Sequence, residues 1–280
     1  MSRSWLITGC SSGFGRRLAS AAAARGDRVL ATARNSEAVF DLVAAFPDLV
    51  IAAQLDVTKP DTAAAAVAKA KASFGGIDIL VNNAGYGLIG AVEEGAPDEY
   101  RPMFEVNVFG LIETTRAALP ALREKGGTIV NFSSGAGIAG SAGSGFYNAT
   151  KFAVEGLSEA LAEELRPFGI HVIIVEPGPF RTEFLGRSIT VAALEMPEYA
   201  GTAGQRRHYR DESDGHQPGD PDKAVAVILR AIDATAPPLH LPLGPIAHTT
   251  AEHKLASFRR DLDRWKSVAI ATDFEADNEA

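Results

Sequence analysis

The pattern that most constrains the fold is an alternation of short apolar runs with longer segments of helical periodicity. Seven runs have the length and two-sided apolar character of strands in a parallel sheet covered by helices: SWLIT, RVLAT, LVIAAQL, IDILVN, GTIVNFS, IHVIIVE and LHLPL. Helical segments lie between them at 14–25, 35–46, 61–74, 98–123, 147–167 and 220–234. Because strand–helix–strand repetition builds parallel sheets, we predict an α/β fold with a doubly wound parallel sheet of about seven strands and helices on both faces.

Composition narrows the class of protein. The net charge of −8 and the isoelectric point near 5.3 argue against a nucleic-acid partner, because phosphate binding needs clustered Lys and Arg. The single cysteine, Cys10, excludes an internal disulfide and a cysteine-rich zinc site, and we expect no metal site. The sequence shows neither a signal peptide nor a membrane span, so we predict a cytoplasmic protein without a membrane partner.

The stretch TGCSSGFG at residues 8–15 can be interpreted in two ways. As G-x-S-x-G it is the nucleophile elbow of a serine hydrolase, with Ser11 as the nucleophile. As a glycine turn it lets backbone approach a pyrophosphate at a helix N-terminus. The stretch follows the first strand, where dinucleotide-binding turns occur, whereas an elbow normally follows several strands. The position favours the dinucleotide turn, and the hydrolase is the weaker alternative.

Further motifs follow in order along the chain: LDV at 55–57, NNAG at 82–85, Asn107, NFSS at 131–134, YNATK at 147–151 and PGPFRT at 177–182. Together with the glycine turn, this set resembles the short-chain dehydrogenase/reductase family in its compact one-domain form. The resemblance covers residues from about 4 to 182 closely and the remainder only in architecture. It implies a Rossmann-type fold and an enzyme that interconverts a carbonyl group and an alcohol with a nicotinamide cofactor.

Tyr147 and Lys151 are four residues apart, so their side chains share one face of a helix. Because an ammonium group favours the phenolate, we predict that Lys151 lowers the pKa of Tyr147. The resemblance implies that Tyr147 donates the proton, that Lys151 also holds the nicotinamide ribose and that Ser134 orients the substrate oxygen. It further implies that Asn107 holds a water connecting Lys151 to solvent. Ser133, one residue before Ser134, would point the other way from the strand end.

The cofactor contacts follow from the glycine turn and from the resemblance. A side chain at Gly13 or Gly15 would block the approach of backbone to a pyrophosphate. Asp56 could serve as the N-cap of the following helix as well as contact the adenine. The predicted cofactor-binding residues are Gly9, Ser11, Ser12, Gly13, Phe14, Gly15, Arg34, Asp56, Val57, Asn83, Ala84, Gly85, Tyr147, Lys151, Pro177, Gly178 and Thr182.

Arg34 bears on the choice of cofactor. Enzymes that use NAD need a carboxylate at the end of the second strand, whereas enzymes that use NADP place a cation there. Here Ala33 stands where the acid is expected and Arg34 follows it, while Glu37 is too far into the next helix. An arginine can also simply stack on the adenine. We predict NADP as the cofactor, with NAD less favoured.

The intact set of Asn107, Ser134, Tyr147 and Lys151 predicts an NADP-dependent carbonyl reductase or alcohol dehydrogenase. The alternative is a regulator of the same fold that binds a dinucleotide without catalysis; its mark would be loss of the tyrosine or the lysine, and neither is lost. The core motifs do not distinguish among the substrates that the family accepts. Long helices at 98–123 and 147–167 predict a homodimer or homotetramer, because such helices commonly pair in this family.

The segment 183–219 is far longer than an ordinary loop, which indicates a lid or a binding loop. Its first part carries apolar residues that we expect to cover an apolar substrate: Phe184, Leu185, Ile189, Val191, Leu194, Met196 and Tyr199. Phe180 and Leu88 are further candidate walls. The alternative is that these apolar residues pack a short helix onto the domain or against another subunit. We expect the polar second part to be solvated or mobile. The whole chain, 1–280, is predicted to be one domain ending in a helical extension at about 245–266.

Overall fold

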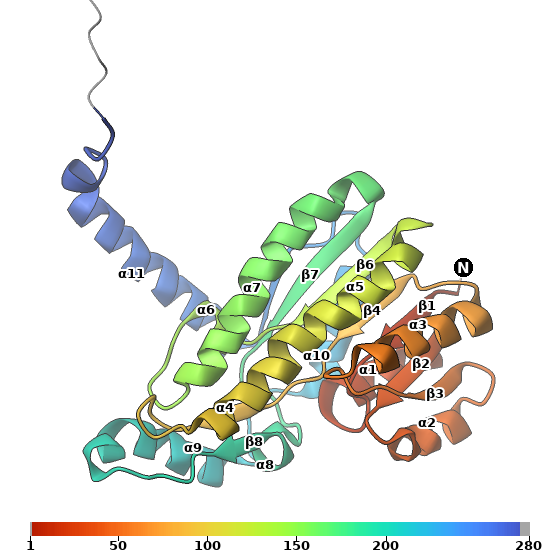
Figure 1. Cartoon of the computed structure of the whole chain (residues 1–280), viewed down its shortest axis with the longest axis horizontal. Coiled ribbons are helices and arrows are strands. Elements are labelled where there is room, and N and C mark those ends of the chain that lie inside the picture. Colours follow the sequence, from red (N-terminus) through yellow and green to blue (C-terminus); the bar gives the residue numbers. More distant parts are fainter. Residues whose placement is uncertain (1, 275–280) are drawn as a thin grey trace, which may run out of the picture.

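The computed structural model describes residues 2–274 and confirms the predicted fold class. Seven parallel strands form one sheet in the order β3-β2-β1-β4-β6-β7-β9 (Figure 1). Each predicted apolar run forms one of them: β1 Ser4–Ile7, β2 Arg28–Ala33, β3 Val50–Gln54, β4 Ile79–Asn82, β6 Gly127–Phe132, β7 Ile170–Pro177 and β9 His240–Leu243. Ile7 of β1 lies between Ala31 of β2 and Val81 of β4, where the strand order reverses. Ligands bind at such a switch point, beyond the carboxyl ends of the strands.

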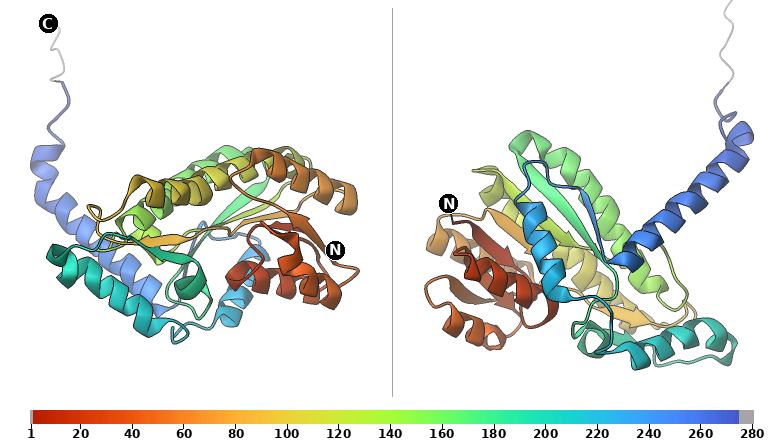
Figure 2. Two further views of the ribbon diagram at one scale, coloured as in Figure 1. Left: turned by 60° about the horizontal axis from the view of Figure 1, so that its bottom comes forward. Right: turned by 180° about the vertical axis from the view of Figure 1, so that it is seen from behind.

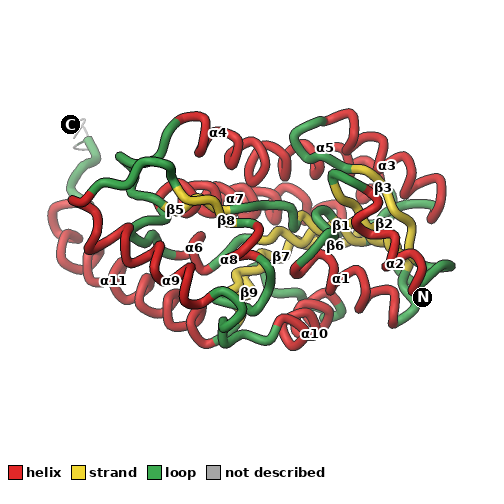
Figure 3. Tube along the Cα trace, turned by 90° about the horizontal axis from the view of Figure 1, so that it is seen from below, coloured by secondary structure: helices red, strands yellow, loops and turns green. Residues whose placement is uncertain are grey.

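Helices cover both faces of the sheet, as Figure 3 shows. One face carries α3 (Pro60–Phe74), α5 (Gly110–Arg123) and α7 (Gly145–Leu165), and the other carries α1 (Gly13–Ala24), α2 (Phe40–Ala45) and α10 (Pro221–Ile232). Successive residues of a strand point to opposite faces. Trp5 and Ile7 of β1 therefore enter the core under α1, while Leu6 enters the core under α3 and α5. Because both faces are buried, the strands lack the polar alternation of a half-exposed sheet.

The predicted helix at 98–123 is interrupted by a wider turn. α4 (Pro97–Phe104) and α5 are joined by a π-helical turn at Glu105–Phe109, which contains the buried Asn107. Such turns are frequent at functional sites. The remaining short elements of the sheet domain are the 3-10 helices Ser36–Val39 and Arg166–Phe168 and the one-turn helix α6 (Gly135–Ile138).

The long segment at 183–219 is folded throughout. It contains α8 (Phe184–Arg187), β8 (Ile189–Val191), the 3-10 helix Pro197–Tyr199, a π-helical turn at Ala200–Gly204 and α9 (Gln205–Ser213). β8 pairs in parallel with β5 (Gly87–Ile89), which follows β4. Much of the second part is exposed to solvent, as predicted, but Arg207 of α9 is buried and forms an ion pair with the buried Glu94.

The predicted C-terminal extension forms α11 (Pro245–Ala269), which follows β9. Its first turns contact the body of the molecule near α6, and its later turns extend away from the body (Figures 1 and 2). None of the helices between residues 2 and 274 combines the length and the apolar composition that crossing a membrane requires.

Candidate active site

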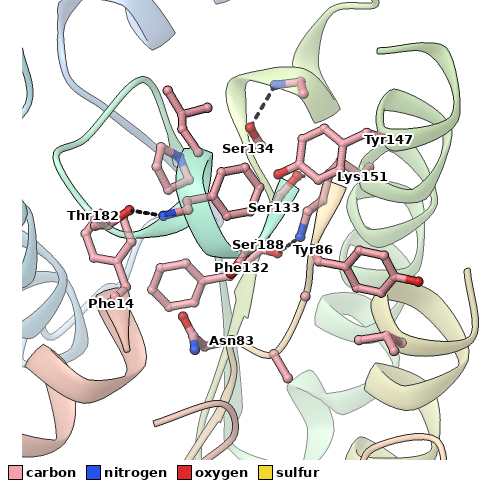
Figure 4. Close-up of a pocket in the computed structure, with 18 of the residues that line it drawn as sticks. Phe14, Asn83, Tyr86, Phe132, Ser133, Ser134, Tyr147, Lys151, Thr182 and Ser188 are labelled. Atoms are coloured by element: carbon pink, nitrogen blue, oxygen red, sulfur yellow. Dashed lines mark hydrogen bonds between the residues drawn. The ribbon is translucent and has the colours of Figure 1, made fainter. Parts of the chain in front are cut away.

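A large cavity opens at the carboxyl ends of the strands (Figure 4). Its volume is about 1910 Å³. A site for one small ligand typically has roughly 300–1,000 Å³, so this cavity has room for a dinucleotide together with a substrate. Gly15 and Asn107 are buried behind its wall. The other predicted site residues all line it: Gly9, Ser11, Ser12, Gly13, Phe14, Arg34, Asp56, Val57, Asn83, Ala84, Gly85, Ser134, Tyr147, Lys151, Pro177, Gly178 and Thr182.

The turn after β1 needs its glycines for two different reasons. Gly9 and Gly13 have φ values of +70° and +58°, a backbone region in which a side chain is strained. Gly15 is helical, but a Cβ there would lie 2.4 Å from Nδ2 of Asn83 and 2.6 Å from the carbonyl oxygen of Gly9. Gly15 therefore lets α1 pack closely on the strand ends. A side chain at Gly15 would therefore clash with Asn83 and with the backbone of Gly9.

Asn83 fixes the shape of this turn from the neighbouring strand end. Its Nδ2 donates to the carbonyl oxygens of Thr8 and Gly9 at 2.9 and 3.1 Å. In return, Oγ1 of Thr8 accepts hydrogen bonds from the backbone N–H groups of Asn83 and Ala84. The turns after β1 and β4 are thus held together across the switch point, and the backbone between them forms a preorganised cradle.

The start of α1 already binds an anion. The backbone N–H of Gly13 donates to Oε2 of Glu183 at 3.0 Å. The pKa of Glu183 is lowered because its carboxylate accepts hydrogen bonds from its own backbone N–H and from that of Gly13. The first turn of α1 contains no acidic residue, so its free amides and dipole favour an incoming negative charge. These donors suit the pyrophosphate of a dinucleotide.

Arg34 and Asp56 lie next to each other at the ends of β2 and β3. The pKa of Asp56 is lowered chiefly by the hydrogen bond from the Thr58 side chain, and the positive charge of Arg34 contributes. Asp56 is not the N-cap of α3, because that helix begins at Pro60 and Lys59 precedes it. The backbone N–H of Glu37 donates to the side chain of Asn35, and neither residue lines the cavity.

Tyr147 lies in the first turns of α7, with its ring almost fully buried at the wall of the cavity. Burial raises the pKa of Tyr147 to about 12, while the adjacent Ser134 hydroxyl acts to lower it. Ser134 caps α6 by accepting a hydrogen bond from the backbone N–H of Ala136. The neighbouring Ser133 is turned toward the backbone of Lys151, at 3.5 Å from its carbonyl oxygen. Figure 4 shows Ser134 and Tyr147 side by side, as the sequence predicts.

Lys151 lies one helical turn beyond Tyr147, and its Nζ is 5.8 Å from the centroid of the tyrosine ring. The ammonium group donates to the carbonyl oxygen of Phe132 at 2.7 Å. Burial lowers the pKa of Lys151 to about 8. The pKa of Tyr147 is raised and not lowered, contrary to the prediction, because burial of the phenol outweighs the effect of the nearby charges.

Asn107 joins the set from the π-helical turn. Its Oδ1 accepts from the backbone N–H of Tyr86 at 3.0 Å, and its Nδ2 donates to the carbonyl oxygen of Tyr86 and to Oγ1 of Thr150. A Cβ on Gly85 would lie 3.0 Å from Oδ1 of Asn107 and 3.7 Å from Nζ of Lys151. Asn107 thus holds the Gly85–Tyr86 backbone against α7 and places the backbone of Gly85 close to the lysine.

This arrangement of a glycine turn, a Tyr–Lys pair and a serine on neighbouring strand ends agrees with comparisons with known proteins. The model of the short chain dehydrogenase family matches residues 3–190. The chain belongs to the short-chain dehydrogenase family. This membership supports an oxidoreductase and leaves the hydrolase interpretation of Ser11 without support.

Similarity to individual short-chain dehydrogenases extends over nearly the whole chain. A short-chain dehydrogenase structure from Streptomyces avermitilis is 47% identical with a TM-score of 0.91, over 98% of this chain and 100% of that one. Oxidoreductase BOA17 of Botryotinia fuckeliana is 35% identical over 97% of this chain and 100% of its own length. The 3-ketodihydrosphingosine reductase of Bacteroides thetaiotaomicron is 36% identical over 86% of this chain and 87% of its own.

Short-chain dehydrogenases of this fold bind NAD or NADP. A Burkholderia cenocepacia structure with NADP is 27% identical, with a TM-score of 0.74 over 94% of this chain and 97% of that one. A 3-ketoacyl-(acyl-carrier-protein) reductase from Brucella melitensis with NADH is 28% identical, with a TM-score of 0.72 over 85% of this chain and 95% of that one. Family membership therefore leaves the choice between the two cofactors to the residues of this chain.

The segment at 183–219 contributes to the cavity differently from the prediction. Phe184 and Leu185 line the cavity, and the ring of Phe184 lies 5.8 Å from that of Tyr147. The other five apolar residues of its first part do not line it. Phe180 lines the cavity as predicted, whereas Leu88 packs in a buried cluster with Met103 and Tyr147. The candidate wall at Leu88 is therefore a core residue.

Sequence reasoning missed the contribution of α9. Arg206 and Tyr209 both line the cavity, and the Arg206 guanidinium lies 4.9 Å from the centroid of the Tyr209 ring. The charge of Arg206 also acts to lower the pKa of Tyr147. In the sequence Arg206 and Tyr209 stand in a polar stretch without a motif. Their position at the cavity depends on the ion pair between the adjacent Arg207 and Glu94, which is far away in the chain.

Proposed function

We propose that the protein is an NADP(H)-dependent oxidoreductase that interconverts a ketone or aldehyde with an alcohol on an apolar substrate. The observation that carries this proposal is the buried phenol of Tyr147 at the cavity wall, with Ser134 beside it and Lys151 one helical turn away. A Tyr–Lys pair on a surface helix is ordinarily a packing contact. Here both side chains are buried at a cavity whose opposite end carries an anion-binding glycine turn.

The residues of this chain fit a nicotinamide dinucleotide. The free amides at the start of α1 would hold the pyrophosphate, and the guanidinium of Arg34 would hold a 2′-phosphate on the adenosine ribose. Asn83 to Gly85 and Lys151 would contact the riboses, and Pro177, Gly178 and Thr182 would contact the carboxamide. When bound, the nicotinamide supplies or accepts the hydride of the reaction.

The side chains of this chain would donate the proton and stabilise the charge that forms as it leaves. With its pKa raised to about 12, Tyr147 keeps its proton at neutral pH and can donate it to a carbonyl oxygen. The hydroxyl of Ser134 can donate a second hydrogen bond to the same oxygen. With a pKa of about 8, Lys151 is mainly charged at neutral pH, so its ammonium can stabilise the tyrosinate that forms as the proton leaves.

An apolar substrate is supported by the walls of the cavity near Tyr147. Phe184 and Leu185 of α8 and the ring of Tyr209 face this space, and closure that excludes water is a recurrent need of such sites. One relative is named 3-ketodihydrosphingosine reductase, a name that denotes reduction of a ketone. We therefore infer that the segment at 183–219 acts as a substrate lid through Phe184 and Leu185.

The proposal is tested by following NADPH oxidation with a panel of ketones and aldehydes that increase in apolar size. Tyr147→Phe keeps the ring but removes the proton donor, so kcat should fall about 10²- to 10⁴-fold while the Kd for NADPH is unchanged. Tyr199→Phe is a matched control, because Tyr199 does not line the cavity and its hydroxyl donates a hydrogen bond to Glu93. NADPH binding without turnover of any panel member would favour the regulator, and near-normal turnover by Tyr147→Phe would overturn the assigned proton donor.

A further inference from the structure

The substrate end of the cavity is lined by cations and lacks carboxylates. We use this name for the part of the lining that comes from residues 133–151, from the segment at 183–219 and from α11. Among residues 2–274, no Asp or Glu belongs to this part, although the chain carries a net charge of −8. The carboxylates that line the cavity follow β3 or belong to α4 and its π-helical turn. The cations of the substrate end are Lys151, Arg187, Arg206 and Lys254.

Acidic residues are present in the same stretches of chain, but they stay outside the lining. Composition alone therefore does not explain why only cations line the substrate end. A concave surface lined by one sign of charge attracts a ligand of the opposite sign. The acidic residues of the segment at 183–219 and of the first turns of α11 that do not line the cavity are Glu183, Glu195, Glu198, Asp211, Glu212, Asp214 and Glu252.

Arg206 combines partial burial with the absence of an ion-pair partner among residues 2–274. Arg187 and Lys254 are exposed to solvent, whereas Arg206 is half-buried. Lys151 is buried, but its ammonium group donates to the carbonyl oxygen of Phe132. The Nε of Arg206 is buried without a hydrogen-bond partner. A buried donor that lacks an acceptor costs free energy, so this guanidinium is suited to an acceptor that a ligand brings into the cavity.

Packing against neighbouring elements fixes the position of Arg206. A Cβ on Gly143, whose φ is +74°, would lie 2.9 Å from the Cβ of Arg206. Because Gly143 directly precedes the start of α7, which carries Tyr147, α9 lies next to this start, as Figure 1 shows. The guanidinium lies 4.9 Å from the centroid of the Tyr209 ring. Contact with a ring occupies the face of a planar guanidinium and leaves the N–H groups at its edge free to donate.

We propose that Arg206 binds an anionic oxygen group, a carboxylate or a phosphate, that the apolar carbonyl substrate carries. The inference rests on the proposed function and adds a charged end to the substrate. A guanidinium binds either group through paired hydrogen bonds. The phosphates of the cofactor belong at the start of α1 and at Arg34, so they do not account for a cation beside Tyr147. The charge of Arg206 also acts on the pKa of Tyr147, which places the anionic group near the reacting carbonyl.

The test compares apolar oxo acids with their methyl esters, which have the same carbonyl and chain without the charge. A series moves the carbonyl away from the carboxylate step by step. Calorimetric titration of the NADP-saturated protein gives the Kd of each compound. At the best spacing, the natural protein should bind the acid about 10- to 100-fold more tightly than the ester, as a charge-assisted hydrogen bond provides. In Arg206→Gln this preference should disappear. A ketone with a phosphate in place of the carboxylate identifies which anion is preferred.

Arg210→Gln is the matched control, because Arg210 lies one turn further along α9, is paired with Asp211 and does not line the cavity. It should keep the full preference for the charged compound. Arg206→Lys retains the positive charge without the planar group and should keep part of the preference. The Kd for NADPH, measured for each variant, should be unchanged, which reports that the fold is intact.

Failure of this inference can be told apart from failure of the proposed function. Turnover of ketones with equal affinity for the charged compounds and the ester would overturn the anion site and leave the reductase. A preference that persists in Arg206→Gln would also overturn it. So would an equal fall of kcat for acid and ester in Arg206→Gln, because Arg206 would then act on Tyr147 and not on the substrate. A preference that depends on Arg206, without turnover of any compound, would support the site and count against the reductase.

Discussion

At the scale of single residues, Arg34 is the side chain that should select the cofactor. It lines the cavity after β2, where the position expected for an acid is the buried Ala33. Because a charge-assisted hydrogen bond contributes about 1.5–3 kcal/mol, Arg34→Gln should lower kcat/KM for NADPH about 10- to 100-fold. The value for NADH should change little.

Arg116→Gln provides the matched control for this measurement, because Arg116 is exposed on α5 and pairs with Glu113. Steady-state kinetics with both cofactors at one substrate concentration series give the comparison. A natural enzyme that prefers NADH, or an equal loss with both cofactors in Arg34→Gln, would contradict the proposed phosphate contact and leave stacking on the adenine as the role of Arg34.

A second residue-scale prediction concerns Glu155, which lies one turn beyond Lys151 on α7. Burial raises the pKa of Glu155 to about 7, the nearby Glu176 adds to the rise, and Ser133 and His240 oppose it. The folded protein therefore binds this proton more tightly than the unfolded chain. The resulting stability is fully present below the ordinary pKa of 4.5 and is lost as the pH rises through about 7.

Glu155→Gln keeps the shape without the charge, so the free energy of unfolding should depend less on pH between 5 and 8. The difference from the natural protein should be at most about 3 kcal/mol, from about 1.4 kcal/mol for each pKa unit. Urea unfolding in the presence of EDTA measures it, because Glu155, Glu176 and His240 place possible metal ligands within 4.8 Å of one another. Glu159→Gln is the control, since Glu159 is exposed on the same helix. Parallel pH profiles for the natural protein and Glu155→Gln would contradict the raised pKa.

The residues of the candidate site could be predicted because their motifs have fixed spacing, and the structure brings Ser134, Tyr147 and Lys151 together. The pKa values of these residues could not be predicted from the sequence. The sequence shows that Lys151 is near Tyr147, but the pKa of the phenol depends on how completely both groups are removed from water. The same limit applies to Glu155 of α7, whose buried partner Glu176 comes from strand β7.

At the scale of elements, α8 should control which substrates the enzyme accepts. Phe184 lines the cavity and contacts the ring of Tyr147. Loss of a buried phenylalanine side chain removes about 1.5–3 kcal/mol of apolar contact, so Phe184→Ala should raise KM for bulky apolar ketones roughly 10- to 100-fold. KM for small polar carbonyl compounds and the Kd for NADPH should change much less.

Leu194→Ala is the control for the lid, because Leu194 belongs to the same segment and is 53% exposed. Equal effects of Phe184→Ala on small and bulky substrates would show that α8 only packs onto the domain. The measurement requires the substrate panel described above and a fluorescence titration with NADPH.

The elements that the sequence did not reveal are short and depend on distant partners. β5 and β8 have three residues each, too few for a periodic pattern, and each is a strand because of its pairing with the other. α9 is anchored by Arg207, which pairs with Glu94 far away in the chain. The π-helical turn at Glu105–Phe109 lies within an apolar pattern that predicts one uninterrupted helix.

At the scale of the whole molecule, the alternation of strands and helices was sufficient to predict the sheet and its covering helices. The central apolar runs are buried on both faces, and right-handed strand–helix–strand connections leave few possible orders for such strands. The direction of α11 was not predictable in this way. It depends on a docking contact of its first turns, while the side chains of its outer half are exposed to solvent.

The cavity joins parts of the chain that are far apart in sequence, from the turn after β1 to the first turns of α11. A dinucleotide bound there should therefore stabilise the whole molecule against unfolding. At a hundredfold excess over its Kd, a ligand that binds only the folded state contributes about 2.7 kcal/mol. For a domain of this size that corresponds to a rise in Tm of about 5–10 °C.

Differential scanning calorimetry with NADPH and with NADH at equal concentrations tests both the dinucleotide site and the preference for NADP. NADPH should raise Tm by several degrees more than NADH, and Arg34→Gln should remove the difference while keeping the smaller shift. Tyr147→Phe should keep both shifts, because it loses the proton donor and not the cradle. A larger shift with NADH would contradict the preference for NADP. If neither cofactor shifted Tm, the glycine turn would not be a dinucleotide site, however well its backbone amides bind the carboxylate of Glu183.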